Sequence, residues 1–328
     1  MKGAAQGLSY REIAQQIGRC HKTVGAEIKR NGGRQQYSAA RAQARAVQMA
    51  SNPRRPSLIE SSPATEGFAR LGFALGWSPQ QISGRIRATN PAGVLPVSTR
   101  TLYRWTARLG QKSKSGFGRK KPGRAVYFLR PRRKYRARNP ATGRLSDTVS
   151  IHQRPAEVAT RETAGHWEAD TMLGPRGTKA CLLTLVERKT RLLIALPVAD
   201  RRAQTVARAL LRHLPIKAQA AGVPILSITT DNGKEFAEHA PIAQALGCAF
   251  YFADPNSPHQ RGTNENTNGL LREFFPKNRN LTLVTSKDLA WVVGQINNRP
   301  RMCLNYLSPA EAAANALRIT NGDIGVAQ

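Results

Sequence analysis

The basic residues of this chain are concentrated in its first 140 residues, which limits what that part can fold into. Residues 1–140 hold 29 Lys and Arg against 4 Asp and Glu, whereas residues 141–328 hold 22 against 16. A net charge of +25 in the first part suits a polyanion, because each phosphate that is neutralised releases counterions. We therefore expect DNA as the partner of the first part. An anionic membrane surface is the competing interpretation, but no long basic amphipathic helix with a bulky apolar face is present.

The cysteines and the apolar runs indicate the setting of the protein. The four cysteines are scattered, with no CxxC pair and no histidine at zinc-finger spacing. A zinc site is therefore not expected, and a reducing cytoplasmic compartment fits. No run of 18 apolar residues and no hydrophobic leader core is present, so we expect a soluble protein with no membrane segment.

Residues 1–50 predict a helix-turn-helix domain. Ser9 offers an N-cap, Glu12 stands at the capping-box position and Gly18 is a helix stop. A second helix is expected at 21–30 after a tight turn. This order of helix, glycine-containing turn and polar second helix is typical of DNA-binding units.

A helical hairpin with no DNA role would show the same pattern, so that alternative stays open. In the second helix, Val24 and Ile28 are expected to pack back on the first. The residues expected to contact DNA are Arg11, Lys22, Thr23, Lys29 and Arg30.

Residues 51–110 predict a second helical unit. Ser78 offers an N-cap and Pro79 stands at the first helical position. A later helix carries Leu102 and Trp105 as core residues. The unit is interpreted as a second helix-turn-helix, with a plain helical packing module as the alternative, because its helices are farther apart in sequence.

Residues 111–160 form a basic linker or arm. The run includes Arg119-Lys120-Lys121 and a denser cluster at 130–136. Like charges at this density repel each other and do not pack. We expect an arm that follows the phosphates of DNA, with a solvated linker as the alternative.

Residues 161–328 show the pattern of a mixed α/β sheet. Three successive strand-like runs are followed by strands that alternate with helices. The expected strands are 167–172, 181–186, 192–198, 225–230 and 249–252. A helix at 201–220, with Asp200 as its N-cap, separates the third strand from the fourth, and a helix at 286–298 comes near the end.

Three carboxylates in this part are candidate catalytic residues. Asp170 lies within the first strand, Asp231 ends the fourth, and Glu265 follows 34 positions later on a helix that Thr263 or Asn264 caps. Each has a structural alternative. A carboxylate within a core strand, such as Asp170, can be hydrogen-bonded locally. Asp231 precedes an Asn-Gly turn sequence, and an acid in a first helical turn complements the helix dipole.

A divalent ion would explain why the three carboxylates share one edge of the sheet. Carboxylates in proximity repel each other unless a cation holds them, and Mg²⁺ prefers oxygen ligands while keeping waters for phosphate oxygens. Two such ions roughly 3.5 to 4 Å apart support in-line phosphoryl transfer. We expect Mg²⁺, with Mn²⁺ as a substitute. Glu168 is a weaker metal candidate, Asp254 is expected in a turn, and His166 and His239 are expected to be structural.

Four segments, at 165–171, 185–190, 230–236 and 251–272, resemble the DDE transposases of the insertion-sequence "IS thirty" family. The resemblance covers nearly the whole chain. It implies an RNase H-like catalytic core in which Asp170, Asp231 and Glu265 are catalytic residues and metal ligands. It also implies that Arg272, seven residues after Glu265, contacts phosphate.

The resemblance further implies a reaction and its partners. Water cleaves a strand at the element's end, and the freed 3′-hydroxyl attacks target DNA. The N-terminal helices would bind the terminal inverted repeats, and the protein is expected to act as a homo-oligomer on DNA near the bacterial nucleoid. A catalytically idle DNA-binding repressor and a nuclease that cuts without joining are the alternatives.

Three departures from the family pattern bear on DNA binding. Residues 1–6 are too short for the helix that usually precedes the first helix-turn-helix. Gly25 and Ala26 stand where a serine-arginine pair is common, which is expected to weaken DNA recognition by that helix. His259 replaces a tryptophan of the loop before Glu265, which removes a stacking ring and leaves the carboxylates in place.

Overall fold

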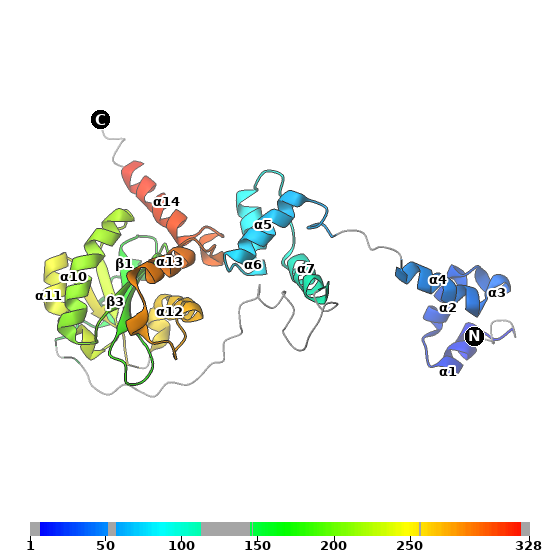
Figure 1. Ribbon diagram of the computed structural model, residues 1–328, viewed down its shortest axis with the longest axis horizontal. Helices are drawn as coiled ribbons and strands as arrows, with labels where there is room; N and C mark the ends of the chain where they lie inside the picture. The colour runs from blue at the N-terminus through cyan, green and yellow to red at the C-terminus, as the bar shows by residue number, and fades with distance from the viewer. Residues whose placement is uncertain (1–6, 52–56, 113–144, 146, 256, 323–328) are drawn as a thin grey trace. The chain divides into compact units, whose positions relative to one another are not determined.

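The computed structural model describes residues 7–51, 57–112, 145, 147–255 and 257–322 (Figure 1). The chain forms two compact units, residues 1–56 and 57–328. Most of the expected basic arm, residues 113–144, lies outside the described residues. None of the described helices is long and apolar enough to cross a membrane.

The described part of the first unit is helical, and its predicted capping signals are confirmed. Ser9 and Glu12 form a capping box, and Gly18 ends the first helix in the left-handed region at φ 63°. Residues 18–20 connect α1 to the second helix. The helices are α1 (Tyr10–Ile17), α2 (His21–Arg30), α3 (Gly33–Gln36) and α4 (Ala39–Ser51).

A small apolar cluster holds α1 against α2. Val24 and Ile28 of α2 are buried together with two residues of α1, as predicted. Gly25 lies on the same side of α2, because a Cβ built there would come 3.3 Å from a ring carbon of Tyr10. This position therefore packs against α1, and of the two departing residues only Ala26 lies exposed.

The second unit begins with three helices around a core of their own. They are α5 (Pro63–Ala74), α6 (Pro79–Thr89) and α7 (Thr99–Lys112). Ser78 and Gln81 form a capping box with Pro79 at the helix start, as the sequence predicts. Leu102 and Trp105 of α7 are fully buried in the shared cluster.

Helix α6 contacts the C-terminal part of the same unit. Gln81 donates a hydrogen bond from Nε2 to the carbonyl oxygen of Pro300 at 2.7 Å. Arg85 forms an ion pair with Glu311 in α14 (Pro309–Gly322). A Cβ at Gly84 would come 2.1 Å from a ring carbon of Tyr306, so the absence of a side chain at residue 84 makes this close approach possible.

The rest of the second unit is a five-stranded mixed sheet with helices on both faces (Figure 1). The strand order is β3-β2-β1-β4-β5, with β1, β2 and β3 antiparallel and β4 and β5 parallel to β1. The strands are β1 (His166–Leu173), β2 (Cys181–Glu187), β3 (Leu193–Val198), β4 (Ser227–Thr230) and β5 (Ala249–Phe252). The predicted mixed α/β sheet is confirmed.

Helices cover the two faces of the sheet through two separate apolar clusters. The helices of this part of the chain are α9 (Glu157–Thr160), α10 (Ala203–Ala220), α11 (His239–Leu246), α12 (Gly262–Phe274) and α13 (Ser286–Asn297). Short 3₁₀ helices are η3 (Ile151–Gln153), η4 (Lys234–Phe236), η5 (Pro258–Arg261), η6 (Leu281–Leu283) and η7 (Met302–Leu304). Trp167 and Ala169 of β1 belong to the cluster under α10 and α11, whereas Met172 belongs to the cluster under α12 and α13. Because side chains alternate along a strand, Asp170 lies on the α12 face.

Two predicted helix starts are wrong. Asp200 is not the N-cap of α10, which begins after Arg202; the Asp200 side chain instead accepts the amide hydrogen of Arg202 at 3.0 Å. Helix α12 begins at Gly262, before the expected caps. Arg261, the last residue of η5, has non-helical dihedrals, Gly262 is the first residue with helical dihedrals, and no side-chain capping bond forms at this start.

We expect Gly84→Ala to destabilise the second unit by about 1–3 kcal/mol, because the added methyl overlaps the Tyr306 ring. Urea unfolding followed by tryptophan fluorescence measures this. Gly67→Ala is the matched control, since a Cβ at Gly67 of α5 meets nothing within 4 Å and alanine is favoured over glycine inside helices. In a double-mutant cycle, Tyr306→Ala should remove most of the cost at residue 84. Equal destabilisation at both glycines would contradict the contact.

Candidate active site

Asp170 and Asp231 lie side by side because their strands are neighbours. Strand β4 runs parallel to β1, with Glu168 paired to Thr229. Two residues further along each strand, the same register brings Asp170 beside Asp231, which follows β4 directly. Asp170 therefore lies within the sheet, and Asp231 lies next to it at the carboxyl end of β4.

The guanidinium of Arg261 lies between these two aspartates. Its Nη2 donates to Oδ2 of Asp231 at 2.9 Å, and its Nη1 is 3.8 Å from Oδ1 of Asp170. Nη1 also donates to the carbonyl oxygen of Ala169 at 3.2 Å. Arg261 immediately precedes α12, so this contact brings the start of that helix to the two aspartates.

A buried hydrogen-bond network holds α12 on the sheet one turn further on. Glu168 is fully buried and forms an ion pair with Arg188. Its second oxygen accepts the backbone amide hydrogen of Asn264 at 2.9 Å. The Asn264 side chain donates to the carbonyl oxygen of Glu168 at 3.0 Å and accepts from the Thr184 hydroxyl at 3.2 Å. Both oxygens of Glu168 are thus engaged within the protein.

Glu265 follows Asn264 on α12. Asn268, three positions later, donates to Oδ2 of Asp170 at 2.9 Å, and residues three apart share a helix face. Glu265 therefore lies on the face of α12 that carries this contact. Its side chain is exposed. Within the described residues, no group of three His, Cys, Asp or Glu is close enough to form a ready metal site.

Glu235 is a fourth carboxylate beside the site that sequence reasoning missed. It is buried, accepts the Thr171 hydroxyl at 2.6 Å and forms an ion pair with Arg201. Burial opposes ionisation, but the hydrogen bonds from Arg201 and Thr171 outweigh it and lower the pKa of Glu235. A Cβ at Gly233 would come within 2.9 Å of both Glu235 and Asp231 oxygens. The partners of Glu235, Arg201 and Thr171, are distant in sequence, so no local pattern indicated its place at the site.

Arg272 lies at the other end of the α12 face. Its Nη2 donates to the carbonyl oxygen of Leu173 at 2.7 Å, and its Nη1 to that of Phe275 at 3.4 Å. The guanidinium therefore connects the last turn of α12 to the end of β1. Phosphate contact by Arg272 stays a prediction.

The weaker candidates have structural partners. Asp254 accepts from Gln260 at 2.7 Å and contacts His152 at 2.8 Å, which fits its expected place in a turn. The His166 ring is hydrogen-bonded to Ser227, and the His239 ring to the carbonyl oxygen of Asp147.

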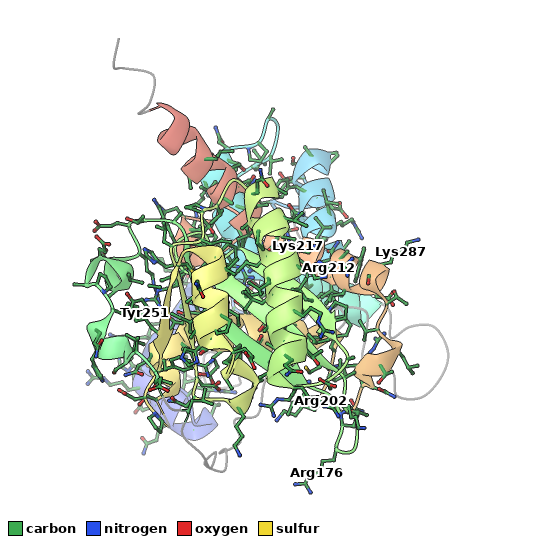
Figure 2. All side chains as sticks on the ribbon, turned by 90° about the vertical axis from the view of Figure 1, so that its left-hand side faces the viewer. Arg176, Arg202, Arg212, Lys217, Tyr251 and Lys287 are labelled. Carbon is green, nitrogen blue, oxygen red and sulfur yellow. The ribbon has the colours of Figure 1, made fainter. Side chains whose placement is uncertain are left out.

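The five predicted DNA contacts of the first unit have exposed side chains. They lie on α1 and α2, outside the apolar cluster, which leaves them accessible to a ligand. Their role in DNA binding stays a prediction. In the second unit, Arg202, Arg212 and Lys217 are also exposed along α10 (Figure 2).

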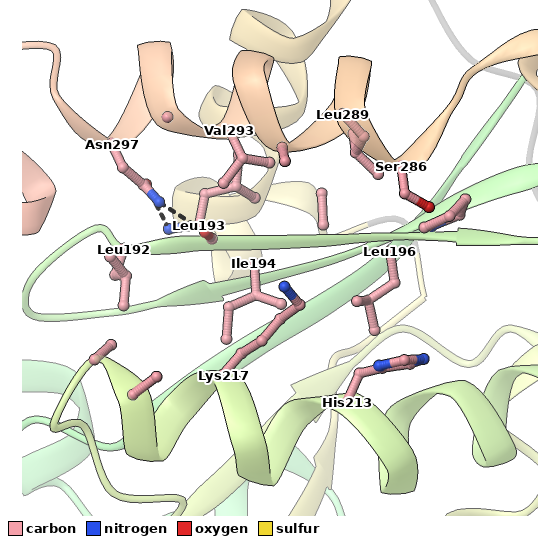
Figure 3. Close-up of a pocket in the computed structure, with 16 residues that line it drawn as sticks. Leu192, Leu193, Ile194, Leu196, His213, Lys217, Ser286, Leu289, Val293 and Asn297 are labelled. Atoms are coloured by element: carbon pink, nitrogen blue, oxygen red, sulfur yellow. Dashed lines mark hydrogen bonds between the residues drawn. The ribbon is translucent and has the colours of Figure 1, made fainter.

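An apolar groove of about 620 Å³ opens elsewhere, along edge strand β3 between α10 and α13 (Figure 3). His213 and Lys217 are the titratable residues in its lining, which contains no carboxylate. Asn297 exchanges two hydrogen bonds of 2.9 Å with the backbone of Leu193 there. The carboxylate chemistry therefore belongs to the edge beside Arg261.

Comparison with known families assigns the two parts of the chain. A helix-turn-helix domain family matches residues 1–31, and an integrase core domain family matches residues 161–258. The fold and these matches define a DNA-binding protein with an integrase-type, RNase H-like core, as the sequence predicts. The catalytic core domain of BIV integrase matches 48% of this chain and 98% of its own at 18% identity, with a TM-score of 0.38.

Curated relatives match over nearly the full chain. Transposase InsI for insertion sequence element IS30C of Escherichia coli is 33% identical over 97% of this chain and 82% of its own length. The transposase for IS1086 of Cupriavidus metallidurans is 34% identical over 95% and 91%, and that for IS4351 of Bacteroides fragilis is 36% identical over 93% and 89%. The chain belongs to this IS30 family of insertion-sequence transposases.

We expect Glu235→Gln to lower the free energy of unfolding by about 1–2 kcal/mol at pH 7, a reduced value because Arg201 is partly exposed. The pKa of Glu235 is lowered below its usual 4.5, so its stabilising contribution is present above that pH and is lost as the pH falls through the folded-state pKa. Urea unfolding at pH 7, 5 and 3.5 measures the difference, with exposed Glu157→Gln as control. A difference that stays constant with pH would contradict this assignment.

Proposed function

We propose that this transposase binds the terminal inverted repeats of its element and catalyses strand cleavage and strand transfer with Asp170, Asp231 and Glu265 as catalytic residues. The observation that carries the proposal is the position of Arg261 between the two aspartates, one helical turn before Glu265. Two carboxylates that share one guanidinium form a site with high affinity for positive charge. Membership of a transposase family supports the reaction class.

The residues fit a divalent cation. Their donors are carboxylate oxygens, which hard ions such as Mg²⁺ and Mn²⁺ prefer, and two of the carboxylates hold the cationic guanidinium of Arg261. When bound, such ions activate the attacking oxygen and stabilise the leaving one. Asp170, Asp231 and Glu265 would hold them.

The chain's own residues orient these carboxylates. Asp170 accepts from Asn268 at Oδ2 and from the Thr171 amide at Oδ1, at 2.9 Å each. Asp231 accepts the amide hydrogen of Gly233 at 3.2 Å. These donors fix which oxygen lone pairs remain for a cation. The turn alternative for Asp231 is therefore compatible with a catalytic role.

The first unit supplies recognition of the element's ends. A helix-turn-helix places its second helix in the major groove, and the exposed basic residues of α2 suit contact with phosphates and base edges. Strand transfer brings two DNA ends together, so we propose that a homo-oligomer acts on DNA. The three carboxylates are all present, which favours an enzyme over an idle repressor.

We expect Glu265→Gln to keep DNA binding and to reduce cleavage and strand transfer more than about a hundredfold with Mg²⁺ or Mn²⁺, because one of the three proposed metal ligands is lost. Labelled element ends incubated with target plasmid measure both steps. Exposed Glu162→Gln should behave as the wild type. Undiminished joining by the Glu265 variant would refute the catalytic assignment, and cutting without joining by the wild type would indicate a simple nuclease.

We expect Arg11→Ala combined with Lys22→Ala to weaken binding of the element ends and to reduce the slope of log affinity against log salt by about 1 to 2, as two phosphate contacts are lost. Fluorescence anisotropy at several salt concentrations measures this on end and scrambled duplexes. Arg212→Ala with Lys217→Ala is the charge-matched control on α10. If both double variants lose their preference for the end duplex over the scrambled duplex to the same extent, the first unit does not recognise the end sequence.

A further inference from the structure

Arg261 holds an unusual position for a cation in a site that is proposed to bind metal ions. Its side chain is only 12% exposed and lies between Asp170 and Asp231. Planar guanidinium groups suit paired carboxylates, because their donors diverge in one plane. Arg261 therefore neutralises two carboxylates that would otherwise repel each other.

The contact is not needed to hold α12 on the sheet. That role belongs to Asn264, which is buried and hydrogen-bonded to Glu168 and Thr184. The apolar side of the helix adds Leu270 and Leu271, both buried in the cluster with Met172. Helix α12 would remain in place without the Arg261 contact.

Arg261 lies outside the regular turns of α12, beside an aspartate that borders solvent. Arg261 precedes the first residue of α12 and has non-helical dihedrals, φ −123° and ψ 36°. A Cβ built on Gly262 would meet no atom within 4 Å. Asp231 has a side chain that is 45% exposed. The guanidinium can therefore leave the aspartates toward solvent without unwinding the helix.

We propose that Arg261 is a built-in counter-ion of Asp170 and Asp231, which occupies their shared position in the metal-free chain and is displaced when a divalent ion binds. The inference rests on the proposed metal site. A bound divalent cation and the guanidinium compete for the same oxygen atoms. The chain thus stays folded without metal, and its affinity for metal is lower than that of the bare carboxylates.

The test is a titration of the full-length protein with Mn²⁺ alone, in which the EPR signal of the free ion is followed. Arg261→Gln keeps a donor for the carbonyl oxygen of Ala169 but removes the charge, and we expect it to bind Mn²⁺ about tenfold more tightly than the wild type. Arg191→Gln is the matched control. Arg191 donates to the Thr263 hydroxyl of α12 at 2.9 Å, so this substitution removes the same charge from a residue that contacts α12 but forms no ion pair with the two aspartates within the described residues.

Thermal unfolding gives a second measurement on the same proteins. Without metal, Arg261→Gln should unfold at a lower temperature than the wild type, and Mn²⁺ should raise its unfolding temperature more than that of the wild type or Arg191→Gln. Arg261→Lys, which keeps the charge but replaces the planar guanidinium by a single ammonium group, should bind Mn²⁺ with intermediate affinity and serves if the glutamine variant does not fold.

The outcomes separate the two proposals. Equal or weaker Mn²⁺ binding by Arg261→Gln, while the wild type binds and Asp231→Asn does not, would overturn the counter-ion proposal alone. Equal tightening by Arg261→Gln and Arg191→Gln would reduce the effect to net charge and would also overturn it. Mn²⁺ binding that Asp231→Asn leaves unchanged would overturn the metal site itself.

Discussion

The buried ion pair between Glu168 and Arg188 is the interaction on which the candidate site depends. Glu168 is 0% exposed, and its second oxygen binds the backbone amide of Asn264. Removing one partner of such a pair costs roughly 3–5 kcal/mol, because the other charge stays buried. The pair fixes the first turn of α12, and the residues on either side of Asn264 then face the aspartates of the sheet.

The same logic of paired charges extends through the whole acidic edge. Glu168 has Arg188, Glu235 has Arg201, and the two aspartates share Arg261. An acidic site of this density, in a chain with a net charge of +31, is neutralised locally by arginines. Glu265, the third proposed catalytic residue, has an exposed side chain. The remaining acids are thus fixed before any ligand arrives.

Sequence patterns predicted the parts of the fold that local rules determine. The strand-like run at 167–172 predicted β1, and Ser9 and Ser78 predicted two helix starts through capping. The pairing of Asp170 with Asp231 follows once β4 is parallel to β1. The start of α12 was missed because it follows η5 directly at Gly262, and no capping side chain marks it.

Contacts between residues far apart in sequence were beyond such rules. Glu235 was missed because its partner Arg201 lies 34 positions earlier and Thr171 another 30, so neither its burial nor its lowered pKa has a local signature. The role of Arg261 is hidden for a different reason. In sequence it is one more basic residue of a loop, and only the packing of α12 against β1 and β4 turns it toward the two aspartates. Residues that neutralise an acidic site are therefore harder to predict from sequence than the acids. An arginine is compatible with many kinds of local structure, whereas a carboxylate inside a buried strand is unusual and draws attention.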